Sequence, residues 1–345
     1  MNMRVKGSGF RLGFGWPESC PHVGRANLVC RLAVPQLQGM EEAPLLSVPD
    51  SAVARTNGHF QLLQSPCGDR LAGCAIVPCA GSPESAAHSL YANLFTAIGA
   101  RTLYRVWNFV PHINAQLAGR EQYQSFNIGR CQAFRERYGE EHMLAQMPAA
   151  SAVGIDSPVL AVAFLAGREQ VASFENPQQV PAYHYPEQYG PVSPSFARAT
   201  VVTAANGQRT GYLSGTSSIR GHATIGAGNL AEQFDTTLDN IRLITERMGF
   251  ADALTKNAPF DARFRFTCGT GKTFRKFADD SSRCWDLASK PVRCSFRRPS
   301  AGRRCYWKSR ACFRLERNLH LASGQQGFVH EGNAPCPPAA PPGVY

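Results

Sequence analysis

The chain has 345 residues, a length that allows one large domain or two ordinary ones, and either can bury a full core. Hydrophobic residues make up 43% of it and charged residues 18%, which excludes an intrinsically disordered protein. It contains no apolar run of about eighteen residues, and its N-terminus lacks the apolar stretch of a signal peptide, so we expect a cytoplasmic protein without a membrane partner.

The first half of the chain alternates strand patterns with helix patterns. Residues 1–83 predict short strands and turns. Apolar residues at helical spacing predict a helix over Glu84–Ile98, and a second helix follows over Gly119–Tyr138. The aromatic and β-branched segment Leu103–Val110 predicts a strand, and the continuous apolar run Pro158–Leu165 predicts a buried one.

The second half begins with a loop and ends with the clearest helix. Five prolines and three tyrosines in Glu175–Pro194 predict an ordered loop or irregular lid. Strands are predicted over Thr200–Ala204 and Gly211–Ile219. An apolar stripe then predicts a helix over Leu230–Met248, which Asn229 can cap.

The last quarter of the chain, Phe266–Tyr345, differs in composition from the rest. It contains 14 of the 36 Lys and Arg residues but only 5 of the 25 acidic ones, so most of the net charge of +11 lies there. Ser281–Arg317 shows no sustained period, and Pro335–Gly343 is expected to be disordered. Because the basic excess is confined to this segment, we do not expect nucleic acid as a partner.

The cysteines do not predict a metal site. Six of the twelve lie in the last quarter, and the others lack the spacing of zinc ligands. Cys74 and Cys79 are five residues apart, but no second pair of cysteines lies at the spacing that a zinc site would require. Free thiols are therefore the better interpretation.

The middle third predicts an anion site. Tyr123 and Arg130 are seven residues apart, about two helical turns, so both can face one cleft. Arg198 follows the tyrosine-rich loop. Arginine binds a carboxylate with two parallel hydrogen bonds, and tyrosine adds a neutral donor, so two such pairs suit a dicarboxylate. The alternative is that each arginine caps a loop or forms a surface ion pair.

The same region contains long and unusual motifs in a fixed order. They are Arg105-Val-Trp-Asn108, Tyr123-x-x-Phe-Asn-x-Gly-Arg130, Pro148-Ala-Ala-Ser-Ala-Val-Gly154, Glu175-Asn-Pro-Gln-Gln179, Tyr189-Gly-Pro191, Ser193-Pro-Ser-Phe-Ala-Arg-Ala199, Ser214-Gly-Thr-Ser-Ser-Ile219 and Gly221-His222. This succession resembles the chorismatase family, whose members cleave pyruvate from chorismate with water and supply starter units or pigment precursors. The resemblance is strong from Leu90 to Ile244 and weaker from Val23 to Pro83.

The resemblance implies an α/β fold of RidA-like units, with mixed sheets packed against helices. It implies a strand-rich part over 1–83, a core with the substrate cleft over 84–265 and an aberrant tail over 266–345. It implies chorismate as the partner and no cofactor. The substrate's two carboxylates would be held by Tyr123, Arg130, Tyr183 and Arg198, the ring would be bounded by Ser214, Gly215 and Thr216, and His222 would be structural.

The chain departs from the family at its C-terminus. The family protonates the enolpyruvyl methylene with a Glu in a closing segment of the type Cys-Arg-x-x-Leu-Leu-x-Glu-Ile-Glu, and no such segment is present. Glu316 and Glu331 lie in unpatterned surroundings. We therefore assign no catalytic residue.

A single shift of reading frame explains the departure. Suppose that each codon begins at the third base of the codon written for this sequence. The codons then possible across Phe266–Ala278 include ones that encode a normal strand end and helix start. The same phase through Pro299–Arg310 permits Ile-Cys-Arg-x-x-Leu-Leu-Leu-Glu-Ile-Glu. One base lost or gained near Arg263–Phe266 would account for both. Such a chain should lack the last strands of its sheet, leave an unpaired edge and be impaired as an enzyme. The alternatives are a remnant that binds dicarboxylates without turnover and, on fold alone, an imine deaminase.

Overall fold

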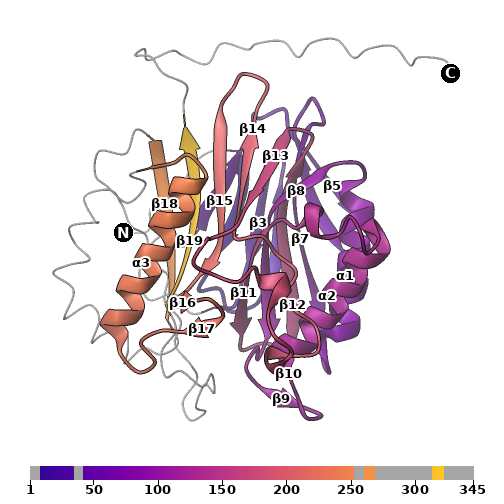
Figure 1. The fold of residues 1–345 in the computed structure, drawn as a ribbon. Helices are drawn as coiled ribbons and strands as arrows, with labels where there is room; N and C mark the ends of the chain where they lie inside the picture. Colours follow the sequence, from indigo (N-terminus) through magenta and orange to yellow (C-terminus); the bar gives the residue numbers. More distant parts are fainter. Residues whose placement is uncertain (1–7, 35–41, 252–259, 269–312, 322–345) are drawn as a thin grey trace.

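A computed structural model describes residues 8–34, 42–251, 260–268 and 313–321 (Figure 1). Its centre is a six-stranded mixed sheet with the order β11-β8-β12-β7-β6-β5, in which only β11 and β8 run parallel to each other. These strands are β5 (Val53–Asn57), β6 (Phe60–Gln64), β7 (Arg70–Pro78), β8 (Thr102–Pro111), β11 (Ala149–Ile155) and β12 (Val159–Gly167).

Two further sheets complete the β structure. A four-stranded sheet of order β2-β3-β1-β4 comprises β1 (Gly9–Gly13), β2 (Cys20–Gly24), β3 (Asn27–Arg31) and β4 (Glu42–Ser47). A five-stranded sheet of order β13-β14-β15-β19-β18 comprises β13 (Gln170–Phe174), β14 (Ala199–Thr203), β15 (Arg209–Thr216), β18 (Phe260–Cys268) and β19 (Phe313–Leu321).

The sheet edge beside β15 corrects one prediction. We expected a chain with this C-terminus to leave that edge unpaired. In the structure β15 pairs with β19 from Arg209↔Leu321 to Thr216↔Leu315, and β19 pairs along its length with β18. The prediction is wrong because a β ladder uses backbone groups, and backbone pairing does not require the family's own sequence.

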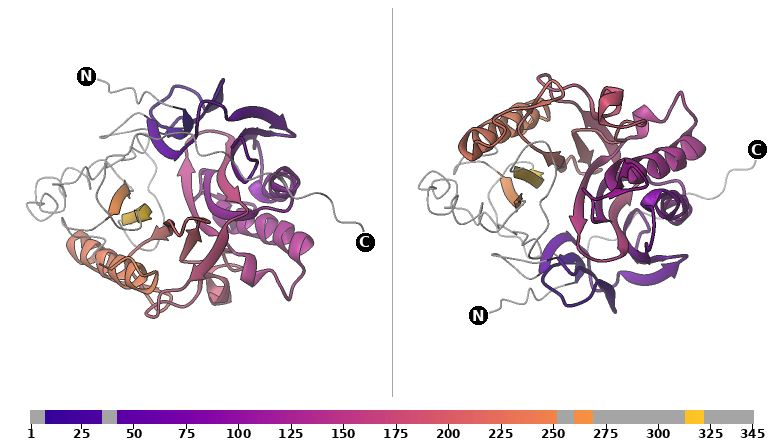
Figure 2. Two further views of the ribbon diagram at one scale, coloured as in Figure 1. Left: turned by 90° about the horizontal axis from the view of Figure 1, so that it is seen from above. Right: turned by 90° about the horizontal axis from the view of Figure 1, so that it is seen from below.

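Two helices cover one face of the six-stranded sheet, and a third lies near β18 and β19 (Figures 1 and 2). Helix α1 (Pro83–Ile98) begins at Ser82, whose Oγ accepts from the Glu84 N–H at 3.4 Å, and α3 (Leu230–Arg247) begins at Asn229, which caps it in the same way. Both helices, and the strands β8, β12, β14 and β15, confirm the predicted elements within a few residues.

The second helix begins later than the sequence predicts. We expected Gly119–Tyr138, but α2 spans Gln122–Tyr138. The preceding residues form a hairpin of β9 (Gln116–Leu117) and β10 (Arg120–Glu121), joined by Ala118 at φ 51° and Gly119 at φ 78°. Two consecutive residues with positive φ form the tight turn typical of two-residue hairpins and cannot continue a right-handed helix.

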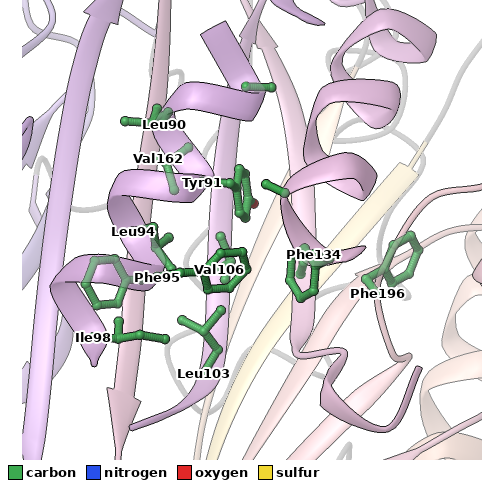
Figure 3. Packing of buried hydrophobic residues seen from close by; sticks show 14 of the residues in the cluster. Leu90, Tyr91, Leu94, Phe95, Ile98, Leu103, Val106, Phe134, Val162 and Phe196 are labelled. Carbon is green, nitrogen blue, oxygen red and sulfur yellow. The ribbon is translucent and has the colours of Figure 1, made fainter. Parts of the chain in front are cut away.

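Helices α1 and α2 touch closely at one glycine. A Cβ added to Gly129 would lie 1.9 Å from the Glu84 carbonyl oxygen, which is far inside van der Waals contact. Around this crossing lies a core of aromatic and aliphatic side chains from both helices and the sheet, including Leu90, Tyr91, Phe134 and Phe196 (Figure 3). A second core fills the opposite face of the sheet, toward β1–β4 and β15.

The predicted irregular segment Glu175–Pro194 is confirmed as a loop between β13 and β14. It contains two short 3₁₀ turns, η2 (Ala182–His184) and η3 (Glu187–Tyr189). Another 3₁₀ turn, η1 (Leu144–Gln146), follows α2, and the small hairpin of β16 (Ile219–Arg220) and β17 (Ala223–Thr224) follows β15. The predicted strand Gly211–Ile219 therefore ends at Thr216 rather than Ile219.

Candidate anion-binding site

Arg130 lies on α2 and points into the core between the helices and the sheet. Its residue is only 2% exposed. Its Nε donates to the Tyr91 hydroxyl on α1 at 2.8 Å, and that hydroxyl donates to Asn108 Oδ1 on β8 at 2.6 Å. Asn108 Nδ2 in turn donates to the Ser151 carbonyl on β11 at 2.9 Å. One helix, a second helix and two strands thus fix the direction of the guanidinium.

The rest of the Arg130 guanidinium makes one further hydrogen bond and two ring contacts. Its Nη1 donates to the Ser195 carbonyl, and its plane lies over the rings of Tyr91 and Phe134 at about 5 Å. Its Nη2 is buried and has no hydrogen-bond partner. Within the described part of the chain no carboxylate lies within ion-pair distance of it. Arg130 is therefore a buried cation with a free donor and no counter-ion there.

Arg198 lies at the end of the loop, just before β14, and is 7% exposed. Its Nη2 donates to the Val180 carbonyl at 3.0 Å and to the Tyr185 hydroxyl at 2.9 Å. Its Nε has no hydrogen-bond partner and lies 3.9 Å from Glu175 Oε2. The guanidinium is thus oriented by two loop groups, and one edge of it remains unsaturated.

Glu175 is the acidic neighbour of Arg198. Its Oε1 accepts from the Arg198 backbone N–H at 3.2 Å, and its Oε2 is buried without a hydrogen-bond partner. Burial raises the pKa of Glu175 to about 7, although the Arg198 charge acts in the opposite direction. Burial and the Glu175 charge together raise the pKa of Tyr183. The Glu175 carboxyl beside Arg198 can therefore be either charged or neutral near neutral pH.

The two predicted tyrosines are Tyr123, on the helix that carries Arg130, and Tyr183, in the loop that leads to Arg198. Tyr123 is half-buried on the first turn of α2 and stacks on Phe126 at 6.5 Å, and it is close enough to affect the pKa of Tyr91, the partner of Arg130. Tyr183 is half-buried in η2, where the charges of Glu175 and Arg198 act on its pKa. The predicted pairs, Tyr123 with Arg130 and Tyr183 with Arg198, stay predictions: Tyr123 is linked to Arg130 through Tyr91, and Tyr183 is linked to Arg198 by charge.

The segment Ser195–Arg198 links the two pairs. Ser195 accepts from Arg130, and Arg198 lies three residues further on. The alternative that the arginines cap a loop is therefore partly correct, since each donates to loop carbonyls. Neither, however, is a surface ion pair, because both side chains are buried.

The loop itself is fastened at three further points. Gln124 Nε2 on α2 donates to the Tyr189 carbonyl at 3.1 Å, and the Tyr189 hydroxyl contacts both Nδ1 and the carbonyl of His222 at 3.0 and 2.9 Å. Val180 N–H donates to the Gly221 carbonyl at 2.9 Å. His222 therefore holds the loop, in keeping with the structural role expected for it.

Ser214, Gly215 and Thr216 lie at the end of β15, directly beside the Arg198 backbone. The Ser214 N–H donates to the Arg198 carbonyl at 2.9 Å, and its Oγ accepts from Ala150 N–H at 2.8 Å and donates to the Ala197 carbonyl. Thr216 Oγ1 donates to the Ser214 carbonyl at 3.1 Å. Through these bonds, residues 214–216 join the five-stranded sheet to the six-stranded sheet beside Arg198.

Sequence reasoning missed three residues of the site. Tyr91, which orients Arg130, occupies the buried stripe of α1 three residues before Leu94, so its burial was predictable but its hydrogen bonds were not. Glu175 belongs to a quoted motif and Tyr185 is one of the three loop tyrosines, but the sequence assigned neither of them a role. Glu175 is followed by Gln178 and Gln179, a pattern that fits an exposed loop equally well. The sequence alone therefore does not reveal that the Glu175 carboxyl is partly buried.

The described cysteines do not converge. The six cysteines with described side chains are free, and Cys30 and Cys74 lie in one core while Cys79 belongs to the other. Among the described residues no group of three or more His, Cys, Asp or Glu side chains could hold a metal ion. In the same residues, no helix is both long and apolar enough to cross a membrane.

Comparison with known proteins relates part of the chain to a described family model. Residues 51–166 match the model described as chorismatase FkbO/Hyg5-like, N-terminal. A 3-hydroxybenzoate synthase from Streptomyces hygroscopicus is 38% identical over 176 residues, 49% of this chain and 51% of that protein. A chorismatase from the same organism is 39% identical over 166 residues, 47% of each chain. The chain thus spans about half the length of the curated relatives it matches.

A solved structure extends the likeness to almost the whole fold. The crystal structure of a chorismatase at 1.08 Å resolution matches with a TM-score of 0.70 and covers 92% of this chain and 93% of its own, at 21% identity. At that identity the match supports the fold alone. The predicted α/β class is confirmed.

Proposed function

We propose that the chain is a member of the chorismatase family, built as a hydrolase that cleaves chorismate to pyruvate and a hydroxybenzoate or a dihydroxycyclohexadiene carboxylate. The observation that supports this most directly is the buried guanidinium of Arg130, whose Nη2 has no partner. An unpaired buried cation is costly unless an anion joins it, and chorismate brings two carboxylates.

The proposed roles follow from the two pairs. Arg130 with Tyr123 and Arg198 with Tyr183 each take one carboxylate, through charge-assisted hydrogen bonds from arginine and a neutral hydroxyl from tyrosine. The end of β15, Ser214–Thr216, lies beside Arg198 and would bound the ring. Holding both carboxylates fixes the vinyl ether relative to the protein, which is the positioning that the reaction needs.

The chemistry begins with protonation of the enolpyruvyl methylene carbon. That carbon is weakly basic, so a positioned acid is required. Protonation produces an oxocarbenium centre, which water attacks to release pyruvate and the diol. Where the released diol then loses one molecule of water, its ring becomes aromatic, and the products are pyruvate and 3- or 4-hydroxybenzoate with no net consumption of water. The family's closing segment, which supplies the acid, is absent from this sequence.

We further propose that one base was lost or gained in the gene near codons 263–266. The family's closing segment is permitted by the shifted frame over Pro299–Arg310. On this proposal the chain keeps the proposed binding residues, the last of which is Thr216, and loses the proton donor that would follow the shift. Sequencing the gene across codons 255–315 tests it, and an unbroken frame there in the genome contradicts it.

The second candidate function is a binding protein that holds chorismate-like dicarboxylates without turnover. The missing closing segment favours it for the chain as written. Two measurements separate the candidates: chorismate binding by calorimetry, and pyruvate release followed with lactate dehydrogenase. Binding without pyruvate identifies the remnant. Pyruvate at ordinary enzyme rates identifies an enzyme that needs no closing segment.

The decisive comparison uses two proteins. One is the chain as written, and the other has residues 266–345 replaced by the translation of the shifted frame. We expect binding by both and rapid pyruvate release only by the second. If neither protein binds chorismate while both remain folded by circular dichroism, the proposed substrate is wrong.

A further inference from the structure

Glu175, which is partly buried, and Arg198, which is buried, form a pair that is left incomplete on both sides. Glu175 Oε2 and Arg198 Nε are 3.9 Å apart, both atoms are buried, and neither has a hydrogen-bond partner. The other oxygen of the carboxyl is fixed by the Arg198 N–H at 3.2 Å. A structural ion pair in such a place would normally close this gap, since a buried unsatisfied charge is costly.

The remaining contacts of Arg198 are all neutral. Its Nη2 donates to the Val180 carbonyl and the Tyr185 hydroxyl, so Glu175 supplies the one negative charge that the described residues place against it. Among these residues the titratable and charged groups that face Glu175 are Arg198 from the loop end and Tyr183 from η2. A ligand carboxylate at Arg198 would therefore bring a second negative charge into one small buried space.

We propose that Glu175 is the positioning residue for Arg198, and that it takes up one proton from solvent when a ligand carboxylate binds there. In the free protein the carboxylate form holds the guanidinium. In the complex the ligand carboxylate replaces that charge, and the neutral carboxyl remains hydrogen-bonded to the Arg198 N–H. No bond other than the O–H of Glu175 is formed. The inference rests on the proposed function, because it takes Arg198 to be a carboxylate-binding group.

The environment of Glu175 makes such an exchange feasible near neutral pH. Burial already raises the pKa of its carboxyl to about 7 in the absence of a ligand. An added anion can only raise it further, because a like charge disfavours ionisation. Proton uptake therefore accompanies binding above about pH 7 and vanishes well below it, where the carboxyl is already neutral.

The test is the pH dependence of chorismate binding, measured by calorimetry on the full chain at pH 6 to 8.5 in buffers of different ionisation enthalpy. For the unchanged chain we expect affinity to fall by up to about tenfold per pH unit above pH 7, with uptake of up to one proton. Glu175→Gln, which mimics the neutral carboxyl, should bind with little pH dependence and no linked proton.

Two control variants distinguish a failure of the proton-uptake proposal from a failure of the proposed function. Glu187→Gln changes an exposed acid in the same loop and should keep the full pH dependence. Glu175→Ala removes the hydrogen bond as well as the charge and should bind more weakly than Glu175→Gln at every pH. Equal pH dependence in the unchanged chain and in Glu175→Gln overturns the inference while leaving the proposed function intact. No binding by any folded variant overturns the proposed function instead.

Discussion

The Tyr91 hydroxyl lies between Arg130 and Asn108, accepting from Arg130 Nε at 2.8 Å and donating to Asn108 Oδ1 at 2.6 Å. Burial raises the pKa of Tyr91, although Arg130 and Asn108 act against the rise, so the hydroxyl remains protonated at neutral pH. The phenol therefore orients the guanidinium without neutralising it. This arrangement leaves the positive charge of Arg130 available to a ligand.

Tyr91→Phe should destabilise the protein by about 1–3 kcal/mol, because it removes the hydroxyl and leaves Arg130 Nε without its acceptor. The ring packing is preserved, so the loss is specific to the hydrogen bonds. Urea unfolding followed by circular dichroism measures it. Tyr138→Phe changes a tyrosine of the same aromatic cluster that lies away from Arg130, and it should cost less than about 1 kcal/mol. Equal losses in both variants contradict the assigned role.

Gly129→Ala should be severely destabilising, by about 3 kcal/mol or more, because the new methyl group would meet the Glu84 carbonyl oxygen at 1.9 Å. The backbone of α1 would have to move away from α2. Gly81→Ala is the matched control, since an added Cβ there has nothing within 4 Å. Thermal unfolding of the two variants should differ clearly, and similar melting temperatures would show that the helices can separate without cost.

The stability should have an acid-sensitive component at Glu169. Burial alone would raise the pKa of Glu169, but hydrogen bonds from Tyr104 and Arg70 lower it overall. A carboxyl whose pKa is lowered in the folded state stabilises above its ordinary pKa, and the stabilisation is lost as the pH falls through the folded value. The pH window therefore lies at and below about 4.5.

Glu169→Gln should thus cost about 1 kcal/mol at pH 7, a modest figure because the Arg70 side chain is 43% exposed. Below pH 4 the cost should shrink as the carboxylate of the unchanged chain is protonated. Denaturant unfolding at pH 7 and pH 3.5 measures the difference. Glu140→Gln, in an exposed pair with Arg135, should change little at either pH. A constant cost for Glu169→Gln at both pH values would refute the linkage.

Ser214→Ala should lower stability by about 2–3 kcal/mol, because it removes two buried hydrogen bonds that join β11 and the loop end to β15. If the segment bounds the ring through its backbone, chorismate affinity should fall by less than about threefold at a temperature where the variant is fully folded. Ser217→Ala, at a half-buried serine just after the strand, serves as the control. A large loss of affinity with unchanged stability would instead place the Ser214 hydroxyl on the ligand.

The sequence predicted the elements of the fold better than the contacts of the site. Periodicity found α1 and α3 and the buried strands, because these elements bury a regular face. It placed the start of α2 three residues early, because the positive φ of Ala118 cannot be read from an alanine. It also failed at the β15 edge, where pairing depends on backbone groups.

The site residues show the same limit. Tyr123 and Arg130 were predicted as binding residues from helical spacing and family motifs, but their contacts, with Phe126 and with Tyr91, were not. The partnership of Arg198 with Glu175 joins positions 23 residues apart across an irregular loop. No period relates such positions, so only the folded loop reveals that the acid and the base share one buried space.

The hydrogen bond from Arg130 to the Ser195 carbonyl has a consequence for truncated forms of the protein. The two residues are 65 positions apart, and the donor lies inside the matched family segment 51–166 while the acceptor lies outside it. A polypeptide that stopped at residue 166 would lack the Ser195 carbonyl that accepts from Arg130, and it would also lack Phe196, which belongs to the same hydrophobic core. We therefore expect a fragment limited to residues 51–166 to be less stable than one that also includes Ser195 and Phe196.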